Sequence, residues 1–185
     1  MLAPVPRWLG RPGLVVALLV VLAAPFAVSA AAAPAQARPG FAAAAFDRGI
    51  LGQLNAVRVL HGLAPLAPNA ELDDSAAAHS SEMGAVGYFE HRSADGTTFW
   101  QRIERWYGDA GYGFWSVGEN LLWSSPDVTP AQALAMWMRS PEHRANILAP
   151  RWREVGIAAV HLDSAPGLFR GLPVTIVTTD FGVRR

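Results

Sequence analysis

The chain has 185 residues, and its fifteen basic and fifteen acidic residues give a formal net charge of zero. Every basic residue is an arginine, and cysteine is absent. These facts exclude Schiff-base lysines, P-loops, disulfides, cysteine nucleophiles and thiolate zinc sites, and the lack of a basic stripe argues against nucleic acid as a partner.

The N-terminal segment is predicted to be a secretory signal. Two arginines precede an uncharged apolar run, Leu14–Val28, and the small residues that follow permit cleavage after Ala30 or Ala37. The run is shorter than the roughly 20 residues that a membrane span needs. The alternative is an uncleaved anchor, which would be the route by which the chain meets a membrane. We therefore expect residues 1–37 to direct the protein to the outside of the cell or to the cell envelope.

The next segment, residues 38–45, is rich in Gly, Ala and Pro and is expected to be a linker before one domain at 46–185. Apolar residues at helical spacing then predict two helices, the first ending at Gly62 and the second capped by Asn69. The expected buried stripes are Phe46, Ile50, Leu54, Val57 and His61 on the first helix, and Leu72, Ala76, His79 and Met83 on the second.

The middle of the chain predicts three shorter helices. A turn at 93–96 precedes a helix whose apolar stripe is Phe99, Ile103 and Trp106. After an irregular glycine-rich stretch, Thr129-Pro130-Ala131-Gln132 forms a capping box that opens a helix ending near Arg139. Ser140-Pro141-Glu142 repeats the start signal, so a further short helix is expected to reach Leu148.

The hydrophobic period changes to that of strands near the C-terminus. Residues 155–162 alternate, and residues 174–181 are rich in β-branched side chains, which together predict an antiparallel hairpin. Leu121–Trp123 is expected to add a short strand. Helices followed by a hairpin predict an α+β fold in which helices pack on a small antiparallel sheet.

Familiar catalytic signatures are missing from the chain. It contains no Gly-x-Ser-x-Gly elbow, no Ser-x-x-Lys and no His-Glu-x-x-His. The candidates that remain are His91 at the exit from a helix, Glu119 after the glycine-rich stretch, and His143 in the first turn of a short helix. Helix ends and loops are where functional groups gather, although a purely structural role stays open. The other histidines are interpreted as packed or peripheral: His61, His79 and His161.

A series of motifs then allows a family to be suggested. In chain order they are Leu54-Asn55-Ala56-Val57-Arg58, Tyr88-Phe89-Glu90-His91 with Asp95-Gly96, Gly118-Glu119-Asn120, the Trp137–Leu148 segment, Glu154-Val155-Gly156-Ile157 and Asp180-Phe181-Gly182. This series resembles the CAP superfamily (cysteine-rich secretory, antigen-five and pathogenesis-related-one proteins) in its bacterial, cysteine-free form. The Trp137–Leu148 segment is the most specific motif, and the series covers nearly all of residues 46–182.

The resemblance implies a three-layer α-β-α sandwich with an open cavity. In many members two His and two Glu line that cavity and can hold a divalent cation. Carried over by motif, His91, Glu119 and His143 take three of those positions, and Ser140 stands where the second Glu is expected. Two imidazoles and one carboxylate can still hold zinc with a fourth position open, whereas magnesium prefers oxygen ligands, so zinc is favoured over magnesium.

The residues around Ser140 are given structural roles. Ser140 is interpreted as the N-cap of the short helix, accepting a bond from the backbone N–H of Glu142 or His143, in preference to a nucleophile. Glu142 is not an obvious substitute for the missing carboxylate, because neighbouring helical residues point about 100° apart.

Supporting residues are expected elsewhere along the chain. Asn55 and Arg58 are interpreted as a buried hydrogen-bonding pair on the first helix. Asn120 and Asn146 are expected to tie loops to the backbone. Trp115 and Trp123 flank the expected loop around Glu119, where they are placed to contact an apolar ligand.

Three functions remain open at this point. The first is a secreted binding module, without turnover, for a small or lipid-like ligand, a cation or an envelope partner. It is favoured because Ser140 stands in place of the second Glu, which leaves the set of two His and two Glu incomplete. The second is a metal-assisted hydrolase of peptides, envelope polymers or esters, with His91 and His143 holding zinc and Glu119 as third ligand or base. The third is a purely structural extracellular domain.

Overall fold

The computed structural model describes residues 41–185; the predicted signal at 1–37 lies outside this range. The helices are α1 (Ala43–Leu60), α2 (Ala70–Val86), α3 (Phe99–Glu104), α4 (Pro130–Arg139) and α5 (Pro141–Ile147), with a 3-10 turn η1 (Gly167–Phe169). The strands are β1 (Ala67–Pro68), β2 (Trp115–Ser124), β3 (Glu154–Leu162) and β4 (Val174–Arg184). Because α1 begins at Ala43, part of the segment predicted as linker is helical.

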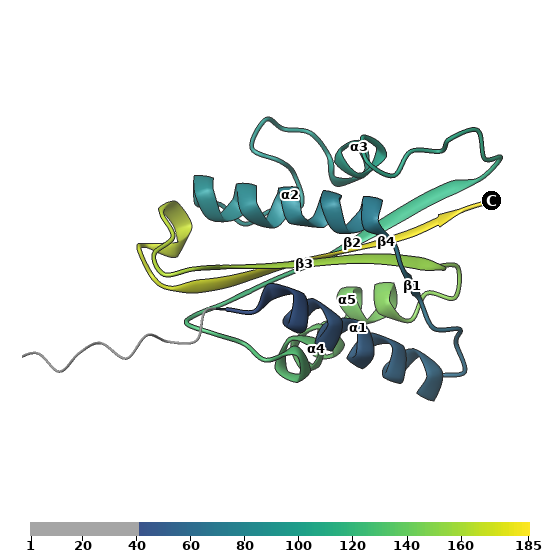
Figure 1. Cartoon of the computed structure of the whole chain (residues 1–185), viewed down its shortest axis with the longest axis horizontal. Coiled ribbons are helices and arrows are strands. Elements are labelled where there is room, and N and C mark those ends of the chain that lie inside the picture. Colours follow the sequence, from purple (N-terminus) through teal and green to yellow (C-terminus); the bar gives the residue numbers. More distant parts are fainter. Residues whose placement is uncertain (1–40) are drawn as a thin grey trace, which may run out of the picture. The chain divides into compact units, whose positions relative to one another are not determined.

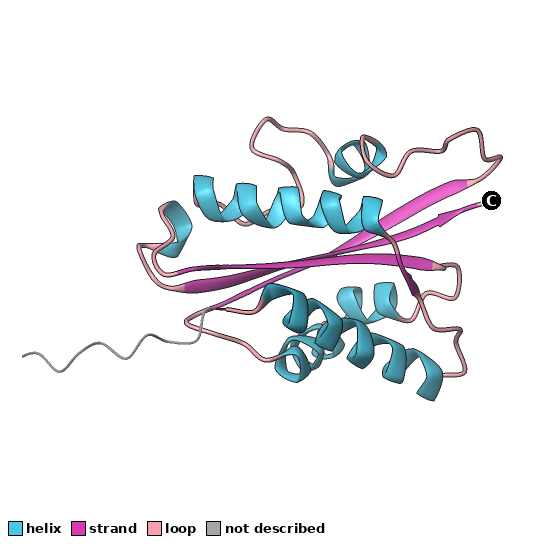
Figure 2. Cartoon of the chain, viewed as in Figure 1, coloured by secondary structure: helices cyan, strands magenta, loops and turns pink. Residues whose placement is uncertain are grey.

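The four strands form one mixed sheet that is the middle layer of the domain. The strand order is β1-β3-β4-β2, with β1 parallel to β3 and the other neighbours antiparallel. Helices α2 and α3 cover one face of the sheet, and α1, α4 and α5 cover the other (Figures 1 and 2). The expected three-layer α-β-α sandwich is therefore confirmed.

The antiparallel strands are longer than the sequence pattern predicts. The expected hairpin is confirmed as β3 and β4, paired from Glu154↔Gly182 to Leu162↔Val174. The short strand expected at Leu121–Trp123 is wrong in length, since β2 spans ten residues and pairs with β4 throughout. Gly118-Glu119-Asn120 breaks the apolar alternation, and the continuous ladder with β4 provides the hydrogen bonds that extend the strand through it.

The helices follow their start signals closely. Asn69 caps α2 as expected, accepting bonds from two backbone N–H groups of the first turn. The stripe predicted for α1 is wrong at its end, because His61 is exposed beyond the helix and Arg58 takes the buried position. The stripe of α3 is wrong in the same way, since Trp106 is 45% exposed and the neighbouring Tyr107 is buried. Both errors extend a helical period past the last residue of its helix.

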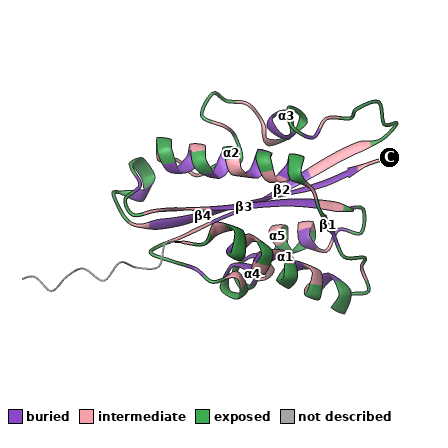
Figure 3. Cartoon of the chain, in the orientation of Figure 1, coloured by how far each residue is buried: buried purple, intermediate pink, exposed green. Residues whose placement is uncertain are grey.

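Most residues of β3 and β4 are buried (Figure 3). On the side of α1 and α4 the core includes Trp137, Trp152 and Phe181, and on the side of α2 it includes Leu72 and Met83. Both large indoles are also hydrogen-bonded, because Trp137 Nε1 donates to Leu121 O and Trp152 Nε1 to Asn146 O. Within residues 41–185 the fold is thus held by packing and hydrogen bonds in a chain without cysteine.

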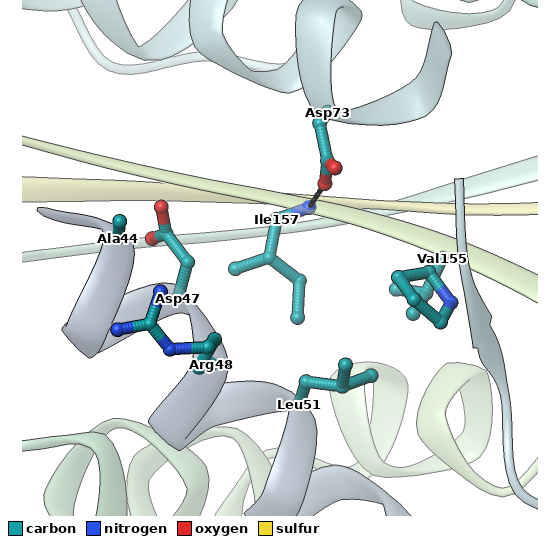
Figure 4. Close-up of a pocket in the computed structure, with 8 residues that line it drawn as sticks. Ala44, Asp47, Arg48, Leu51, Asp73, Val155 and Ile157 are labelled. Atoms are coloured by element: carbon teal, nitrogen blue, oxygen red, sulfur yellow. Dashed lines mark hydrogen bonds between the residues drawn. The ribbon is translucent and has the colours of Figure 1, made fainter. Parts of the chain in front are cut away.

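The outer edge of β3 is protected by two carboxylates. Strand β1 covers only the beginning of β3, and beyond it Asp73 of α2 accepts the N–H of Ile157 at 2.8 Å (Figure 4). Asp47 of α1 accepts the N–H of Ala159 at 3.0 Å. Burial raises the pKa of Asp47 to about 7, in spite of this hydrogen bond. These two hydrogen bonds occupy N–H groups of the strand edge that could otherwise pair with another chain.

Helix α2 approaches the sheet at Gly156 without room for a side chain. A Cβ at this position would lie 2.0 Å from the carbonyl carbon of Leu72. We therefore expect Gly156→Ala to destabilise the domain by about 1–3 kcal/mol through overpacking, measured as the free energy of unfolding in urea. The matched control is Gly52→Ala on the exposed face of α1, where a Cβ meets nothing within 4 Å. That variant should gain about 0.5–1 kcal/mol from helix propensity. Equal effects of the two changes would contradict the close approach.

Candidate functional site

The structure brings His91, Glu119 and His143 to one open cleft with a volume of about 400 Å³. His91 follows α2, Glu119 lies on the edge strand β2, and His143 lies in α5. The cleft therefore spans the edge of the sheet and draws on both helical layers. Its other lining residues are Phe99, Val117, Gly118, Asn120, Glu142, Asn146 and Arg151.

Glu119 is buried at the base of the cleft and is bound on both carboxylate oxygens. Its side chain is 1% exposed, whereas that of His91 is 53% exposed. The Nδ1 of His91 lies 2.7 Å from Oε1 of Glu119, and because a carboxylate can only accept, Nδ1 donates. The guanidinium of Arg102 binds Oε2. Glu119 is therefore placed to orient His91, whose Nε2 is left available to a ligand.

The buried side chain of Arg102 in α3 holds Glu119 and His91 in this arrangement. Its side chain is 6% exposed, and besides Glu119 it donates to the backbone oxygen of His91 at 3.2 Å and to Ser93 Oγ at 3.3 Å. One guanidinium thus holds both the strand and the loop of the site. The sequence analysis missed Arg102. The available signal was its position three residues after Phe99, which places a charged residue on the apolar stripe of the helix.

Two asparagines hold α5 against β2 on the opposite face of the sheet. Asn120 Nδ2 donates to the backbone oxygen of His143 at 3.1 Å, and Asn146 Nδ2 donates to that of Glu119 at 3.2 Å. These are the side-chain-to-backbone bonds expected for both residues. At Gly118 a Cβ would lie 2.7 Å from the Trp152 ring, so only glycine at this position lets β2 lie this close to the Trp152 side chain.

His143 is partly buried in the wall of the cleft. Burial lowers its pKa, the nearby His91 lowers it further, and Glu142 opposes the shift. The imidazole of His143 is consequently neutral at pH 7 and can donate or accept hydrogen bonds. Glu142 also lines the cleft, which corrects the expectation that its helical direction removes it from the site. The cleft is open at the first turn of α5, so Glu142 and His143 both border it.

Ser140 does not line the cleft. It stands between α4 and α5 with the extended backbone of an N-cap, but its side chain makes no capping hydrogen bond. The predicted bond to the backbone N–H of Glu142 or His143 is therefore wrong. The first turn of α5 is instead secured through the backbone, where Arg144 N donates to Ser140 O.

Asn55 and Arg58 lie away from the cleft and do not bind each other. Asn55 pairs with the backbone of Leu66 through both its amide atoms. The buried Arg58 donates to the backbone oxygens of Ile147 at 2.7 Å and Ala149 at 3.1 Å. The predicted pair is thus wrong in its partners, because each side chain satisfies carbonyls of a loop or helix end. Arg58 thereby anchors the end of the helix that carries His143.

The two tryptophans expected beside Glu119 do not reach the cleft. Trp115 Nε1 donates to Tyr107 O at 2.7 Å, and the Trp123 ring packs on Phe169 at 5.2 Å between centroids. Both belong to β2, so the expected loop is wrong, and neither indole lines this cleft. Phe99 and Val117 provide the apolar part of the lining instead.

Two further properties of residues 41–185 bear on the predictions. No three His, Asp or Glu side chains in this range are placed to share one cation, so the zinc site of His91, Glu119 and His143 stays a prediction. Among these residues no helix combines the length and apolarity needed to cross a membrane.

The family is decided by comparison with known proteins. The profile of the cysteine-rich secretory protein family, CAP, matches residues 51–177. The chain belongs to the CAP family.

Two curated relatives are both from Bacillus subtilis (strain 168). The uncharacterized protein YkwD is 30% identical over 120 residues, which cover 65% of this CAP chain and 44% of YkwD. The uncharacterized membrane protein YlbC is 32% identical over 111 residues, covering 60% of this chain and 30% of YlbC. The chain thus spans less than half of the length of these relatives.

Solved structures show the same fold. An extracellular protein containing a SCP domain from Bacillus anthracis has a TM-score of 0.59 at 26% identity, over 77% of this CAP chain and 41% of that chain. An outer surface protein from Borrelia burgdorferi has a TM-score of 0.58 at 18% identity, over 75% of this chain and 92% of that chain. A cysteine-rich secretory protein from Staphylococcus aureus has a TM-score of 0.56 at 19% identity, over 80% of this chain and 41% of that chain.

Removal of the buried guanidinium of Arg102 should cost the CAP domain much of its stability. In Arg102→Ala the carboxylate of Glu119 stays buried without its partner, so we expect a loss of about 3–5 kcal/mol in the free energy of unfolding, measured in urea. Arg105→Ala, three residues further along the chain, removes an exposed arginine and should change stability by no more than about 0.5 kcal/mol. A similar small change in both variants would contradict the bridging role of Arg102.

Substitution of Ser140 tests the corrected cap. Because its hydroxyl makes no capping bond, Ser140→Ala should change the free energy of unfolding by less than about 0.5 kcal/mol. Thr129→Ala at the start of α4 removes a side chain that does accept a bond from Gln132 N, and should cost about 1 kcal/mol. Thermal or urea unfolding of both variants distinguishes the two caps, and a loss at Ser140 as large as that at Thr129 would restore the original interpretation.

Proposed function

We propose that this CAP domain is an exported binding module whose cleft takes a small ligand. The observation that carries the proposal is the composition of the cleft, which combines imidazole, amide, carboxylate and guanidinium groups with an apolar part formed by Phe99 and Val117. The extracellular description of the Bacillus anthracis neighbour and the N-terminal signal pattern support export.

The lining suits a ligand that has both hydrogen-bonding and apolar groups. His143 is neutral, His91 is oriented by Glu119, and Asn120 and Asn146 provide amides. Arg151 adds a positive charge and lies over the Trp152 ring, 4.1 Å from its centroid. These groups match short peptides or saccharides, which are the units of envelope polymers. The lining has no hydroxyl or thiol side chain, so nothing in it supports a Ser, Thr or Cys nucleophile.

A second candidate is the metal-assisted hydrolase, and one observation favours it. A carboxylate that accepts a bond from one imidazole nitrogen is the usual partner of a zinc-binding histidine, and Glu119 has this relation to His91. In that arrangement His91 and His143 would hold zinc, and Glu119 would orient His91 without binding the metal itself. The two candidates differ in whether zinc is required.

A ligand titration tests the proposal. Short peptides and saccharides are added to the domain, and backbone amide NMR shifts are followed with and without zinc. We expect shifts in the residues that line the cleft, namely His91, Phe99, Val117–Asn120, α5 and Arg151. We also expect a Kd at least about tenfold weaker in the double variant His91→Ala/His143→Ala, since each lost hydrogen bond is worth about 1 kcal/mol. His61→Ala is the control, because His61 is exposed and outside the cleft.

The other outcomes identify the alternatives. Zinc-dependent cleavage of a peptide or ester, lost in the double variant, would replace the binding module by the hydrolase. Equal binding of zinc by the wild type and the double variant would contradict a zinc site formed by His91 and His143. If neither protein binds a ligand and the double variant is only less stable than the wild type, the result would favour a purely structural role for His91 and His143.

A further inference from the structure

A second cleft lies between α2 and α3 and has no part in the function proposed above. Its volume is about 380 Å³, and it shares no lining residue with the first cleft, that of His91 and His143. Helices α2 and α3 cover the face of the sheet opposite to α5 (Figure 1). The charged, hydroxyl and aromatic side chains that line the second cleft are Glu82, Ser93, Asp95, Arg102, Arg105 and Trp106.

Trp106 gives the second cleft an indole that has no partner among residues 41–185. The residue is 45% exposed, and every exposed Trp, Tyr and Phe side chain in this range lies within residues 100–114. The buried indoles of Trp137 and Trp152 donate to backbone oxygens, whereas in the described part of the chain no acceptor, aromatic ring or guanidinium pairs with that of Trp106. Covering exposed apolar surface is favourable, so a free indole in a cleft indicates a ligand.

The polar groups of the second cleft are fixed by contacts with neighbouring side chains. Thr97 N donates to Asp95 Oδ1 at 2.8 Å, and Arg105 donates to Thr97 Oγ1 at 3.2 Å. The hydroxyl of Tyr88 donates to Oε2 of Glu82, which leaves Oε1 available to a ligand. Further N–H groups of Arg105 are available in the same way. Groups that are positioned before binding lose less conformational freedom when a ligand arrives.

The combination of both charges with one free ring selects the class of ligand. The carboxylates of Glu82 and Asp95 are accompanied by the guanidinium of Arg105, so a simple ion of either sign would meet a like charge. Carboxylates accept hydrogen bonds and a guanidinium donates them, and a hydroxyl group can do both. A sugar ring carries several hydroxyl groups and also has an apolar face of C–H groups, which can cover an indole.

We propose that the second cleft binds a neutral saccharide, whose ring stacks on Trp106 and whose hydroxyl groups bind Glu82, Asp95 and Arg105. This site goes beyond the proposed function, because it uses neither His91 nor His143. It would attach the domain to a glycan while the first cleft stays open. An amino-acid zwitterion also matches both charges but leaves the indole uncovered, so it is the alternative to be tested.

An NMR titration of the protein tests the site. Maltotriose, cellotriose and tri-N-acetylchitotriose are added separately, and the backbone amide and Trp indole N–H signals are followed. We expect shifts at the Trp106 indole and at residues 93–97 with at least one trisaccharide, and the same shifts in His91→Ala/His143→Ala. The double variant separates this site from the first cleft. The absence of these shifts with all three trisaccharides would overturn the proposal.

Substitution of the ring tests its role in binding. Trp106→Ala should weaken the Kd measured from these shifts at least about tenfold, and Trp106→Tyr, which keeps an aromatic ring, should stay within about threefold of the wild type. Trp100→Ala is the matched control, because Trp100 is 44% exposed in the same segment but does not line the second cleft. An equal Kd in Trp106→Ala and Trp100→Ala would contradict stacking on Trp106.

A change in a polar partner provides a second variant. Arg105→Ala removes an exposed arginine, so the fold is retained, and the Kd should weaken at least about threefold through the lost hydrogen bonds. L-alanine is the probe for the zwitterion. If L-alanine shifts the signals of Trp106 and residues 93–97 and no trisaccharide does, the second cleft is a zwitterion site and the saccharide proposal is wrong.

Discussion

The buried contact between Arg102 and Glu119 is the interaction on which the arrangement of the cleft depends. It joins α3, in one helical layer, to β2 at the edge of the sheet, and the same guanidinium holds the backbone of His91. A buried ion pair is useful only when its remaining hydrogen-bonding capacity is satisfied. Here His91 and Ser93 use part of that capacity, while Arg102 Nε has no partner among the described residues, and the pair orients the site as well as compensating its charge.

The other wall of the cleft is built independently of this pair. Asn120 and Asn146 bind α5 to β2, and Arg58 binds the carbonyls at the end of α5 from the first helix. The edge strand therefore carries one set of polar contacts on each face. Since Glu119 and Asn120 are neighbours and point to opposite faces, two consecutive residues connect the two helical layers to one opening.

This construction explains how a CAP domain can keep its shape without cysteine. Two buried tryptophans each donate a hydrogen bond to the backbone while filling the core, and Gly118 and Gly156 allow strands and helices to touch directly. The site differs from the pattern implied by the family resemblance, because Ser140 stays outside the cleft and Glu142 borders it. The polar lining of the cleft consequently comprises two imidazoles, two carboxylates, two amides and one guanidinium.

Much of the domain was determined by the sequence alone. The helix starts at Asn69 and Thr129, the final hairpin and the α+β class followed from local signals, because capping, turn formation and period depend on neighbouring residues. The family was suggested by the resemblance of the sequence motifs. The motifs also named His91, Glu119 and His143. The length of β2, the partners of Asn55 and Arg58, and the role of Arg102 were decided by the tertiary structure. Their contacts join residues far apart in the chain, and whether a buried charge is compensated depends on what other elements bring to it.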